Sequence, residues 1–376
     1  MRQINPDVVG AFPITPSTEI PEYFSGYVAD GLVDTGFIPV ESEHSAMSTC
    51  IGASAAGARA MTATSSCGLA YMWELLYVSA SMRLPIVMSV VNRALSGPIN
   101  INNDHSDSMG ARDSGWIQMY AETNQEAYDN FIQAVLIAEK CRLPVMACQD
   151  GFITSHAVEN ITLWDDAAMK KFVGTYEPDH YLLNADEPMA VGPYAASNYC
   201  MEAKKAQTEA MKRAKKAILD VAKEFESLTG QSYGFFEGYR LDDAEYAVVA
   251  IGSVCGTAKD AVDAMRERGL RAGLLKIRVF RPFPAEEIAN ALKGCRAIAI
   301  MDRSESYNAV GGPLGAEVTA ALYRAKAHAE VINIMYGLSG RDVRVEDIEQ
   351  LFDNLVKLGD GEQVYDETCP YLGLRE

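Results

Sequence analysis

The sequence of 376 residues lacks the features that mark several large classes of protein. No run of eighteen apolar residues occurs, so no membrane-spanning helix is expected. Lysine and arginine, 33 together, are outnumbered by 51 aspartates and glutamates, and the formal net charge of −18 argues against nucleic acids and anionic membranes as partners. The first residues show no apolar core of a secretory signal, and we therefore expect a cytoplasmic protein.

Ligand motifs built on cysteine and glycine are also missing. The eight cysteines form no C-x-x-C pair, so we expect neither a zinc site nor an iron–sulfur cluster within the chain. In a cytosol these thiols should be reduced. Neither G-x-G-x-x-G nor G-x-x-x-x-G-K-S/T occurs, which leaves no sign of a nucleotide site.

What the sequence does contain is an alternation of short apolar runs and helical patterns, which predicts a parallel α/β architecture. The length favours about two domains at ~150 residues each, and we place them at residues 1–230 and 240–376. In the first, strands are expected at residues 36–40, 58–63, 85–91 and 144–149, and helices at 45–60, 127–138 and 197–228. In the second, strands are expected at residues 246–251, 272–277, 297–301 and 331–335, and helices at 258–268, 285–292, 345–358 and from residue 311 onward. Residues 160–193 should form an irregular excursion and residues 230–238 a linker.

Each of the four expected strands of the first domain ends in polar or glycine-containing sequence. These ends are residues 41–43, 64–68, 92–93 and 150–151. Because ligands collect at the carboxyl ends of strands in open α/β sheets, we expect the four ends to build one site.

Glu43 is the most informative residue of these four ends. It lies between an apolar strand and a stretch rich in alanine and serine, where an acid is commonly a charge that meets the helix dipole. Held instead in a dry cleft, its protonated form would be favoured. One chemistry that needs a buried glutamate is thiamine diphosphate catalysis, in which a carboxyl group hydrogen-bonds the aminopyrimidine ring. Glu41, two residues earlier, is the better candidate for a solvated or ion-paired acid.

Arg93 and Thr15 are candidates for binding a substrate carboxylate. Arg93 follows a strongly apolar run, and its guanidinium can grip a carboxylate in a bidentate fork; the alternative is a surface cap. Thr15 lies between Pro13 and Pro16, which stiffen the backbone, and its hydroxyl can donate to a carboxylate oxygen; the alternative is a plain turn.

Two further motifs are interpreted as structural. His105 and Asp107 resemble a metal-ligand cluster, but no third ligand is near in sequence, and we favour a hydrogen-bond network in a loop. Gly359-Asp-Gly361 resembles the motif by which thiamine diphosphate enzymes bind Mg²⁺ and the diphosphate, but the asparagine that follows in that motif has no counterpart. We therefore expect a loop after the last helix, and a chain that carries only the aminopyrimidine half of a site.

In order and spacing, the motifs resemble the alpha subunits of the 2-oxoacid:ferredoxin oxidoreductases, and among these pyruvate:ferredoxin oxidoreductase. The resemblance covers nearly the whole chain. It is carried by Phe12-Pro-Ile-Thr-Pro-Ser-Thr18, Glu41-Ser-Glu43, residues 52–57, residues 62–66, residues 104–107 with 111–112, residues 124–127, residues 150–152, Arg281-Pro-Phe-Pro284, Asp302-Arg303 and Gly311-Gly-Pro-Leu314.

The resemblance implies a fold and roles for four residues. The fold is a pyrimidine-binding thiamine diphosphate domain followed by a domain like the transketolase C-terminal domain. Glu43 would contact the aminopyrimidine, and Thr15 and Arg93 would hold the substrate carboxylate. Pro13 would line the cofactor pocket. Cys67 departs from the family pattern, which often has glutamine there.

The resemblance also implies an activity that needs partner subunits. The reaction is the reversible oxidative decarboxylation of pyruvate with coenzyme A to acetyl-CoA, CO₂ and reduced ferredoxin. Thiamine diphosphate would be shared with a beta subunit, and Mg²⁺ and the [4Fe–4S] clusters would be held by partner subunits, with gamma and delta subunits completing the complex. The alternatives are a branched-chain or 2-oxoglutarate enzyme, and a non-catalytic subunit with the same fold.

Overall fold

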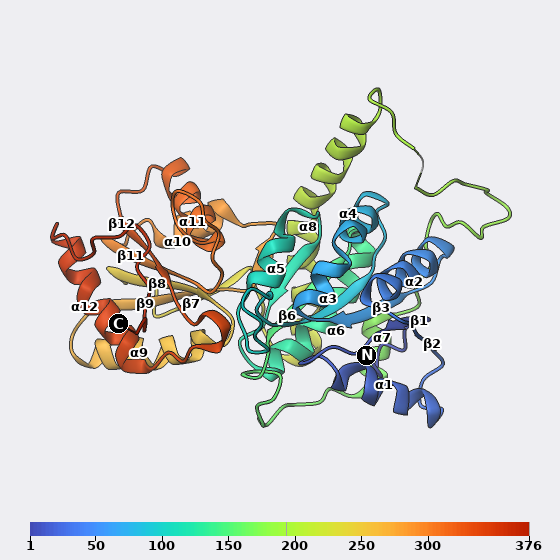
Figure 1. Ribbon diagram of the computed structural model, residues 1–376, viewed down its shortest axis with the longest axis horizontal. Coiled ribbons are helices and arrows are strands. Elements are labelled where there is room, and N and C mark those ends of the chain that lie inside the picture. The colour runs from blue at the N-terminus through green and yellow to red at the C-terminus, as the bar shows by residue number, and fades with distance from the viewer. Residues whose placement is uncertain (193, 376) are drawn as a thin grey trace.

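The computed structural model describes residues 1–192 and 194–375, and contains two β-sheets that lie side by side with helices on their faces (Figure 1). The first sheet has the strand order β10-β5-β6-β4-β3-β1-β2, in which all neighbours are parallel except β10 with β5. Its strands are β1 (Val8–Ala11), β2 (Gly36–Pro39), β3 (Ala60–Thr64), β4 (Val87–Asn92), β5 (Ile117–Tyr120), β6 (Val145–Asp150) and β10 (Val279–Arg281).

Helices cover both faces of the first sheet because the strands between them are apolar on both sides. The helices are α1 (Glu19–Ala29), α2 (Glu43–Ala56), α3 (Ser66–Tyr71), α4 (Trp73–Ser81), α5 (Ser106–Gly110), α6 (Asn124–Cys141), α7 (Asp166–Val173) and α8 (Cys200–Thr229), with a 3-10 turn at Ala111–Asp113. α1, α6, α7 and α8 enclose one hydrophobic cluster, and α2 to α5 enclose another on the opposite face. Ser42 and Thr123 begin α2 and α6 by accepting hydrogen bonds from the backbone amides of Ser45 and Glu126.

The second sheet has the order β12-β11-β8-β9-β7, and only the edge strand β7 is antiparallel to its neighbour. Its elements are β7 (Phe236–Tyr239), β8 (Tyr246–Ile251), α9 (Val254–Glu267), β9 (Ala272–Ile277), α10 (Ala285–Leu292), β11 (Ala297–Asp302), α11 (Pro313–Arg324), β12 (Glu330–Met335), a 3-10 turn at Leu338–Gly340 and α12 (Val345–Gly359). Gly359 is the last residue of α12, so the Gly-Asp-Gly motif begins within the helix, and only Asp360 and Gly361 lie in the loop that was predicted.

The structure confirms the predicted parallel architecture and corrects it in three places. Residues 236–238 of the expected linker belong to β7 (Phe236–Tyr239), because this segment pairs with β9. The expected excursion at residues 160–193 contains α7. Three short strands, β1, β5 and β10, were not expected from the sequence. In the part of the chain that the structure describes, no helix is both long and apolar enough to cross a membrane.

β10 joins the two sheets directly. It follows β9 of the second sheet by a single residue, yet it pairs with β5 of the first, with Val279 opposite Met119 and Arg281 opposite Gln118. Arg278, between the two strands, is buried and donates to Asn130 and Gln133 of α6. The first sheet is therefore completed by a strand from the second half of the chain.

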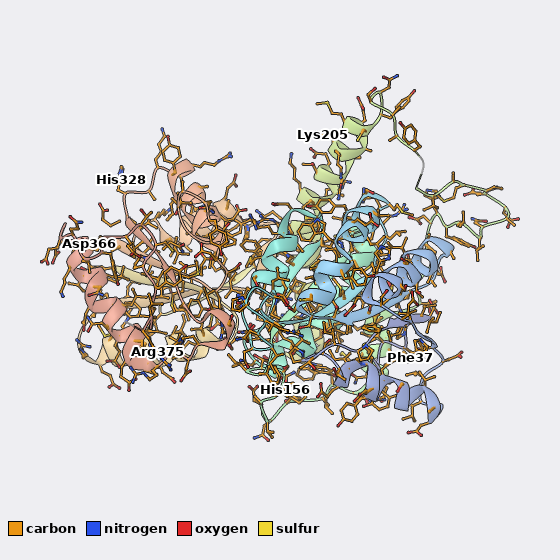
Figure 2. All side chains as sticks on the ribbon, in the orientation of Figure 1. Phe37, His156, Lys205, His328, Asp366 and Arg375 are labelled. Atoms are coloured by element: carbon orange, nitrogen blue, oxygen red, sulfur yellow. The ribbon has the colours of Figure 1, made fainter. Side chains whose placement is uncertain are left out.

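One part of the first domain stands apart from the body. The N-terminal part of α8 projects from the rest of the chain, and Lys205 lies on this projecting part (Figures 1 and 2). Residues 200–206 at the start of the helix are exposed, and its first buried residue is Gln207. Only the remainder of α8 packs against α6 and the core.

Candidate functional site

The candidate site lies at the carboxyl edge of β1 to β4. Because these strands are parallel neighbours, the segments that follow them meet at one edge of the sheet. The segment after β1 carries Pro13 and Thr15, and the junction of β2 with α2 carries Glu43. The turn after β3 leads to Gly68, and Arg93 directly follows β4.

Glu43 is the first residue of α2 and is 8% exposed. Its carboxylate takes part in no hydrogen bond or ion pair with residues 1–192 or 194–375. Glu41, by contrast, is exposed and accepts a hydrogen bond from the Ser45 hydroxyl. A nearly buried acid without a donor is costly unless something else satisfies it, so the Glu43 carboxylate is available to a ligand.

Gly68 allows this carboxylate to lie close against the backbone that follows β3. A β-carbon at position 68 would lie 2.7 Å from Oε1 of Glu43 and 2.5 Å from Oγ1 of Thr64, both too close for a side chain. Thr64 is fully buried, and its Oγ1 has no hydrogen-bond partner in the described chain. The sequence marks the segment 64–68 only as a polar strand end and singles out neither of these residues.

The structure brings Arg93 and Thr15 together. Arg93 is 8% exposed rather than on the surface; its Nη1 donates to the backbone carbonyl of Thr15 at 3.0 Å, and its Nε to the carbonyl of Asn100 at 3.0 Å. Nη2 and the second hydrogen of Nη1 have no partner among these carbonyls. Together they are the two donors that a carboxylate approaching the end of the guanidinium needs. The Thr15 side chain is exposed. No hydrogen bond within the described chain joins Glu43 to Arg93 or Thr15, so Glu43 borders the same edge without a hydrogen bond to this pair.

Cys67 connects the segments that follow β3 and β4. Its Sγ lies 3.0 Å from Oγ of Ser96. This hydrogen bond lowers the pKa of the Cys67 thiol from its ordinary value, against the opposing effect of partial burial, and the charge of Arg93 acts in the same direction. The residue that departs from the family pattern therefore lies between the Glu43 side and the Arg93 side of the edge.

Asp107 and His105 are both hydrogen-bonded, as predicted, but Asp107 lies in α5 rather than in a loop, and the two residues belong to separate networks. Asp107 accepts from the backbone amides of Ser66 at 2.9 Å and Arg93 at 3.0 Å, and from Nδ2 of Asn92 at 2.8 Å. Burial raises the pKa of Asp107 to about 6 in spite of these donors. Asp107 thus fixes the backbone of both segments that frame the site.

The end of β6 lies at the same edge, because Asp150 pairs with Asn92 at the end of β4, but the Asp150 side chain is bound within the fold and is not available to a ligand. Asp150 is 1% exposed and binds Nε2 of His105 at 2.8 Å. It also accepts from the amide and hydroxyl of Ser253, at 2.9 and 2.5 Å, and from Nη1 of Arg303 at 3.2 Å. Because Ser253 and Arg303 come from the second sheet, Asp150 connects the two halves of the chain.

A cluster of three carboxylates near this junction is also fully engaged, in this case by lysines. Glu122, Glu126 and Glu237 have oxygens close enough to hold a metal ion. Lys276 occupies their centre, however, at 2.7, 2.5 and 2.6 Å, and Lys259 binds Glu122 at 2.9 Å. Burial alone would lower the pKa of Lys276, but Glu126 and Glu122 raise it overall. The cluster is therefore an ion-pair network between the two halves of the chain.

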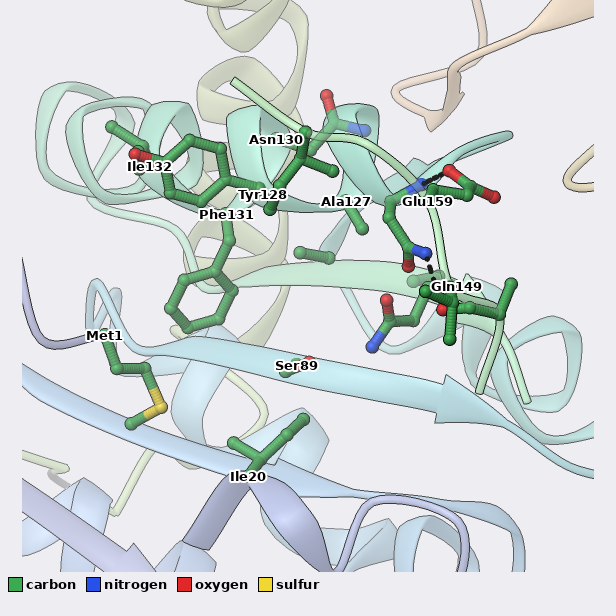
Figure 3. A pocket seen from close by; sticks show the side chains of 16 residues that line it. Met1, Ile20, Ser89, Ala127, Tyr128, Asn130, Phe131, Ile132, Gln149 and Glu159 are labelled. Atoms are coloured by element: carbon green, nitrogen blue, oxygen red, sulfur yellow. Dashed lines mark hydrogen bonds between the residues drawn. The ribbon is translucent and has the colours of Figure 1, made fainter. Parts of the chain in front are cut away.

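A cavity of about 530 Å³ lies on the face of the first sheet, between α1 and α6. Figure 3 shows Ile20, Phe131, Ser89 and Gln149 around it. Thr15, Glu43 and Arg93 do not line this cavity. The candidate site is thus distinct from it and lies along the edge of the sheet.

Comparisons with known families and proteins agree with this geometry. Residues 1–223 match the family described as pyruvate flavodoxin/ferredoxin oxidoreductase, thiamine diphosphate-binding, and residues 244–348 match the pyruvate:ferredoxin oxidoreductase core domain II. Pyruvate synthase subunit PorA of Thermotoga maritima is 53% identical over 100% of this chain and 95% of its own length. The subunit of the same name from Methanocaldococcus jannaschii is 47% identical over 98% of this chain and 94% of its own. Ketoisovalerate oxidoreductase subunit VorA of Pyrococcus furiosus is 42% identical over 97% of this chain and 92% of its own length.

Two solved structures share the fold at low identity. A 2-oxoglutarate:ferredoxin oxidoreductase from Magnetococcus marinus superposes with a TM-score of 0.68 at 19% identity, over 95% of this chain and 62% of that one. A split-gene transketolase superposes with a TM-score of 0.51 at 12% identity, over 94% of this chain and 92% of that one. These likenesses confirm the predicted fold class. The chain belongs to the pyruvate flavodoxin/ferredoxin oxidoreductase family, and residues 1–223 correspond to its thiamine-diphosphate-binding domain.

Proposed function

We propose that this chain is the alpha subunit of a ferredoxin-dependent 2-oxoacid oxidoreductase that acts on pyruvate. The reaction is the oxidative decarboxylation of pyruvate with coenzyme A to acetyl-CoA, CO₂ and reduced ferredoxin, or its reverse. The observation that carries this conclusion is 53% identity to a pyruvate synthase subunit over the whole chain. The ketoisovalerate relative, at 42%, makes a branched-chain 2-oxo acid the second candidate substrate.

The Glu43 side of the edge fits the aminopyrimidine ring of thiamine diphosphate. The carboxylate has no donor within the described chain, and the missing side chain of Gly68 lets it lie close against the backbone. When bound, thiamine diphosphate supplies a thiazolium carbon that adds to 2-oxo acids and accepts electrons after decarboxylation. Glu43 would hold or accept a proton at a ring nitrogen, and Pro13, in the exposed segment after β1, would line the pocket.

The Arg93 side would hold the substrate carboxylate. The free donors of the Arg93 guanidinium are matched to a carboxylate, and the Thr15 hydroxyl is exposed at the same place. Asp107 and the carbonyls of Thr15 and Asn100 hold Arg93 in position, so its orientation is set before substrate arrives.

The rest of the catalytic machinery is assigned to partner subunits. In this proposal residues 1–230 form the pyrimidine-binding domain and residues 240–376 the transketolase C-terminal-like domain. A beta subunit supplies the diphosphate site, Mg²⁺ and a [4Fe–4S] cluster, gamma and delta subunits complete the complex, and the complex works in the cytoplasm with ferredoxin. The relatives are named as subunits, and the cysteines of this chain are unpaired and occur without the spacing of a cluster motif.

Activity of the native complex tests the proposal. The complex would be isolated through a tag on this chain and assayed with pyruvate, a branched-chain 2-oxo acid and 2-oxoglutarate, each with coenzyme A and a viologen dye. We expect pyruvate to give the highest kcat/KM. A higher value for the branched-chain acid would select the second candidate, and a complex without activity on any of them would indicate a non-catalytic subunit. Iron and sulfide analysis of the chain purified alone tests the division of labour, because a stoichiometric cluster there would contradict it.

A further inference from the structure

Thr64, the last residue of β3, carries a hydroxyl for which the fold provides no partner. The residue is 0% exposed, and its Oγ1 receives and donates no hydrogen bond within residues 1–192 and 194–375. Thr62, two residues earlier on the same strand and also fully buried, donates to the carbonyl of Gly10 at 2.8 Å. A buried hydroxyl without a partner destabilises the fold, so the Thr64 hydroxyl calls for an explanation outside the folding of this chain.

The carboxylate of Glu43 lies close to the Thr64 hydroxyl. Oγ1 of Thr64 and Oε1 of Glu43 lie 2.5 and 2.7 Å from the same point, the position that a β-carbon of Gly68 would take. Both oxygens therefore lie against the same side of Gly68. Because Oγ1 of Thr64 is sealed from solvent, a ligand cannot reach it, whereas the Glu43 side chain is already beside it.

We propose that Thr64 is a positioning residue for Glu43, and that its hydroxyl donates a hydrogen bond to Oε1 of Glu43 when the subunits assemble around the cofactor. The inference rests on the proposed role of Glu43. One carboxylate oxygen is then held by Thr64, and the other is left to face the ring nitrogen. A donor to the carboxylate stabilises its negative charge, so Thr64 would act on the charge of the acid as well as on its orientation. Gly68 is required because any side chain there would separate the two residues.

The first test measures stability, using the full chain alone. Thr64→Val replaces the hydroxyl with a methyl group of similar shape and should leave the midpoint of thermal unfolding unchanged or raised, because no protein hydrogen bond is lost. Thr62→Val is the matched control and should lower the midpoint, since it breaks the bond to Gly10. If both variants lower the midpoint equally, the Thr64 hydroxyl has a structural partner and the proposal is overturned.

The second test follows proton exchange at the thiazolium carbon by NMR in the assembled complex. Thr64→Val should slow exchange about tenfold, the effect of losing a donor to a charged acceptor. It should also move the acidic limb of the pH profile to higher pH, and Thr64→Ser should restore both. In a Glu43→Gln background Thr64→Val should have no further effect.

The outcomes separate this proposal from the one on which it rests. If Glu43→Gln slows exchange but Thr64→Val leaves rate and pH profile unchanged, the positioning role fails and the role of Glu43 stands. If Glu43→Gln has no effect, the role of Glu43 fails, and Thr64 loses its function with it. If Thr64→Val instead weakens thiamine diphosphate binding with an unchanged pH profile, the hydroxyl contacts the cofactor and the positioning role is overturned.

Discussion

Glu43 and Asp150 both lie at the carboxyl side of the same sheet, but they differ in whether the chain provides partners for their carboxylates. Asp150 is bound by His105, Ser253 and Arg303, whereas no residue of the described chain binds the Glu43 carboxylate. A buried acid whose partners are in the chain holds structure together. A nearly buried acid without partners is left for a ligand, and this difference separates the interface between the sheets from the candidate site.

The largest expected effect is on stability and comes from Asp150→Ala. Removing the carboxylate leaves the Arg303 guanidinium buried without its counter-charge and Nε2 of His105 without its hydrogen-bond partner, which should lower the free energy of unfolding by about 3–5 kcal/mol. Glu43→Gln, which breaks no bond within the described chain, should change it by less than about 0.5 kcal/mol. Urea unfolding of both variants measures the contrast, and equal losses would contradict it.

The loss of stability in Asp150→Ala should also depend on pH. Burial by itself would raise the pKa of Asp150, but His105, Arg303 and Ser253 outweigh burial and hold the pKa well below its ordinary value of 3.8. Because the pKa is lower in the folded than in the unfolded chain, the stabilisation is present above that value and is lost as the pH falls. The difference between wild type and Asp150→Ala should therefore be constant from neutral pH to about pH 5 and shrink below about pH 4.

The second prediction concerns Glu43, the acid without a partner in the described chain. Glu43→Gln should slow proton exchange at the thiazolium carbon by a factor of roughly 10² or more, because a positioned proton-transfer group is lost. NMR exchange in the assembled complex measures this step. Glu41→Gln is the matched control, since Glu41 is exposed and lies two residues away. Similar rates for the two variants would remove the distinction between these glutamates.

The third prediction concerns Arg93→Ala, which should weaken pyruvate binding by about 2 kcal/mol. This is the low end for a buried charge pair, since two edges of the guanidinium already hold backbone carbonyls. Arg93→Lys keeps the charge but loses the planar fork, so its pyruvate affinity should lie between those of the wild type and Arg93→Ala. Pyruvate affinity of the complex measures the effect.

Arg83 provides a control for the structural part of this effect. It also donates to two backbone carbonyls, of Cys141 and Arg142, but it precedes β4 and so lies at the opposite edge of the sheet. Arg83→Ala should lower stability without changing pyruvate affinity. Wild-type affinity in Arg93→Ala would leave Arg93 with only the structural role that Arg83 has.

The smallest expected effect is that of Thr15→Ala. Its hydroxyl is exposed and neutral, and Arg93 binds its carbonyl rather than its side chain, so the loss in pyruvate affinity should be about 1 kcal/mol, or about fivefold. Thr18→Ala, at a threonine whose side chain does not cap α1, should have no effect on affinity. An effect of Thr15→Ala as large as that of Arg93→Ala would indicate that the hydroxyl contributes more than a single neutral donor.

The sequence predicts long apolar strands well and short paired ones poorly. β8 and β9 are six-residue runs buried along their whole length, so composition is sufficient to locate them. β10 has three residues and becomes a strand only because β5 is beside it, a contact between distant parts of the chain that no local pattern contains.

The same limit applies to the site. The rule that ligands collect at strand ends locates Glu43, Arg93 and Asp150 equally, because it describes backbone position. It does not predict that the second sheet would supply Ser253 and Arg303 to Asp150 and nothing to Glu43. Thr64 escapes sequence reasoning for a related reason, since the lack of a partner is a property of the packed interior.

The strand β10 has a consequence for how the protein can move. A rotation of one sheet against the other would break main-chain hydrogen bonds of β10 with β5, and not only side-chain contacts. Closure about a hinge between the two sheets, a common way to exclude water from a reaction, is therefore resisted by the backbone itself. In the proposed complex, the two sheets would therefore meet the partner subunits in a fixed relative orientation, and little entropy would be lost in ordering them.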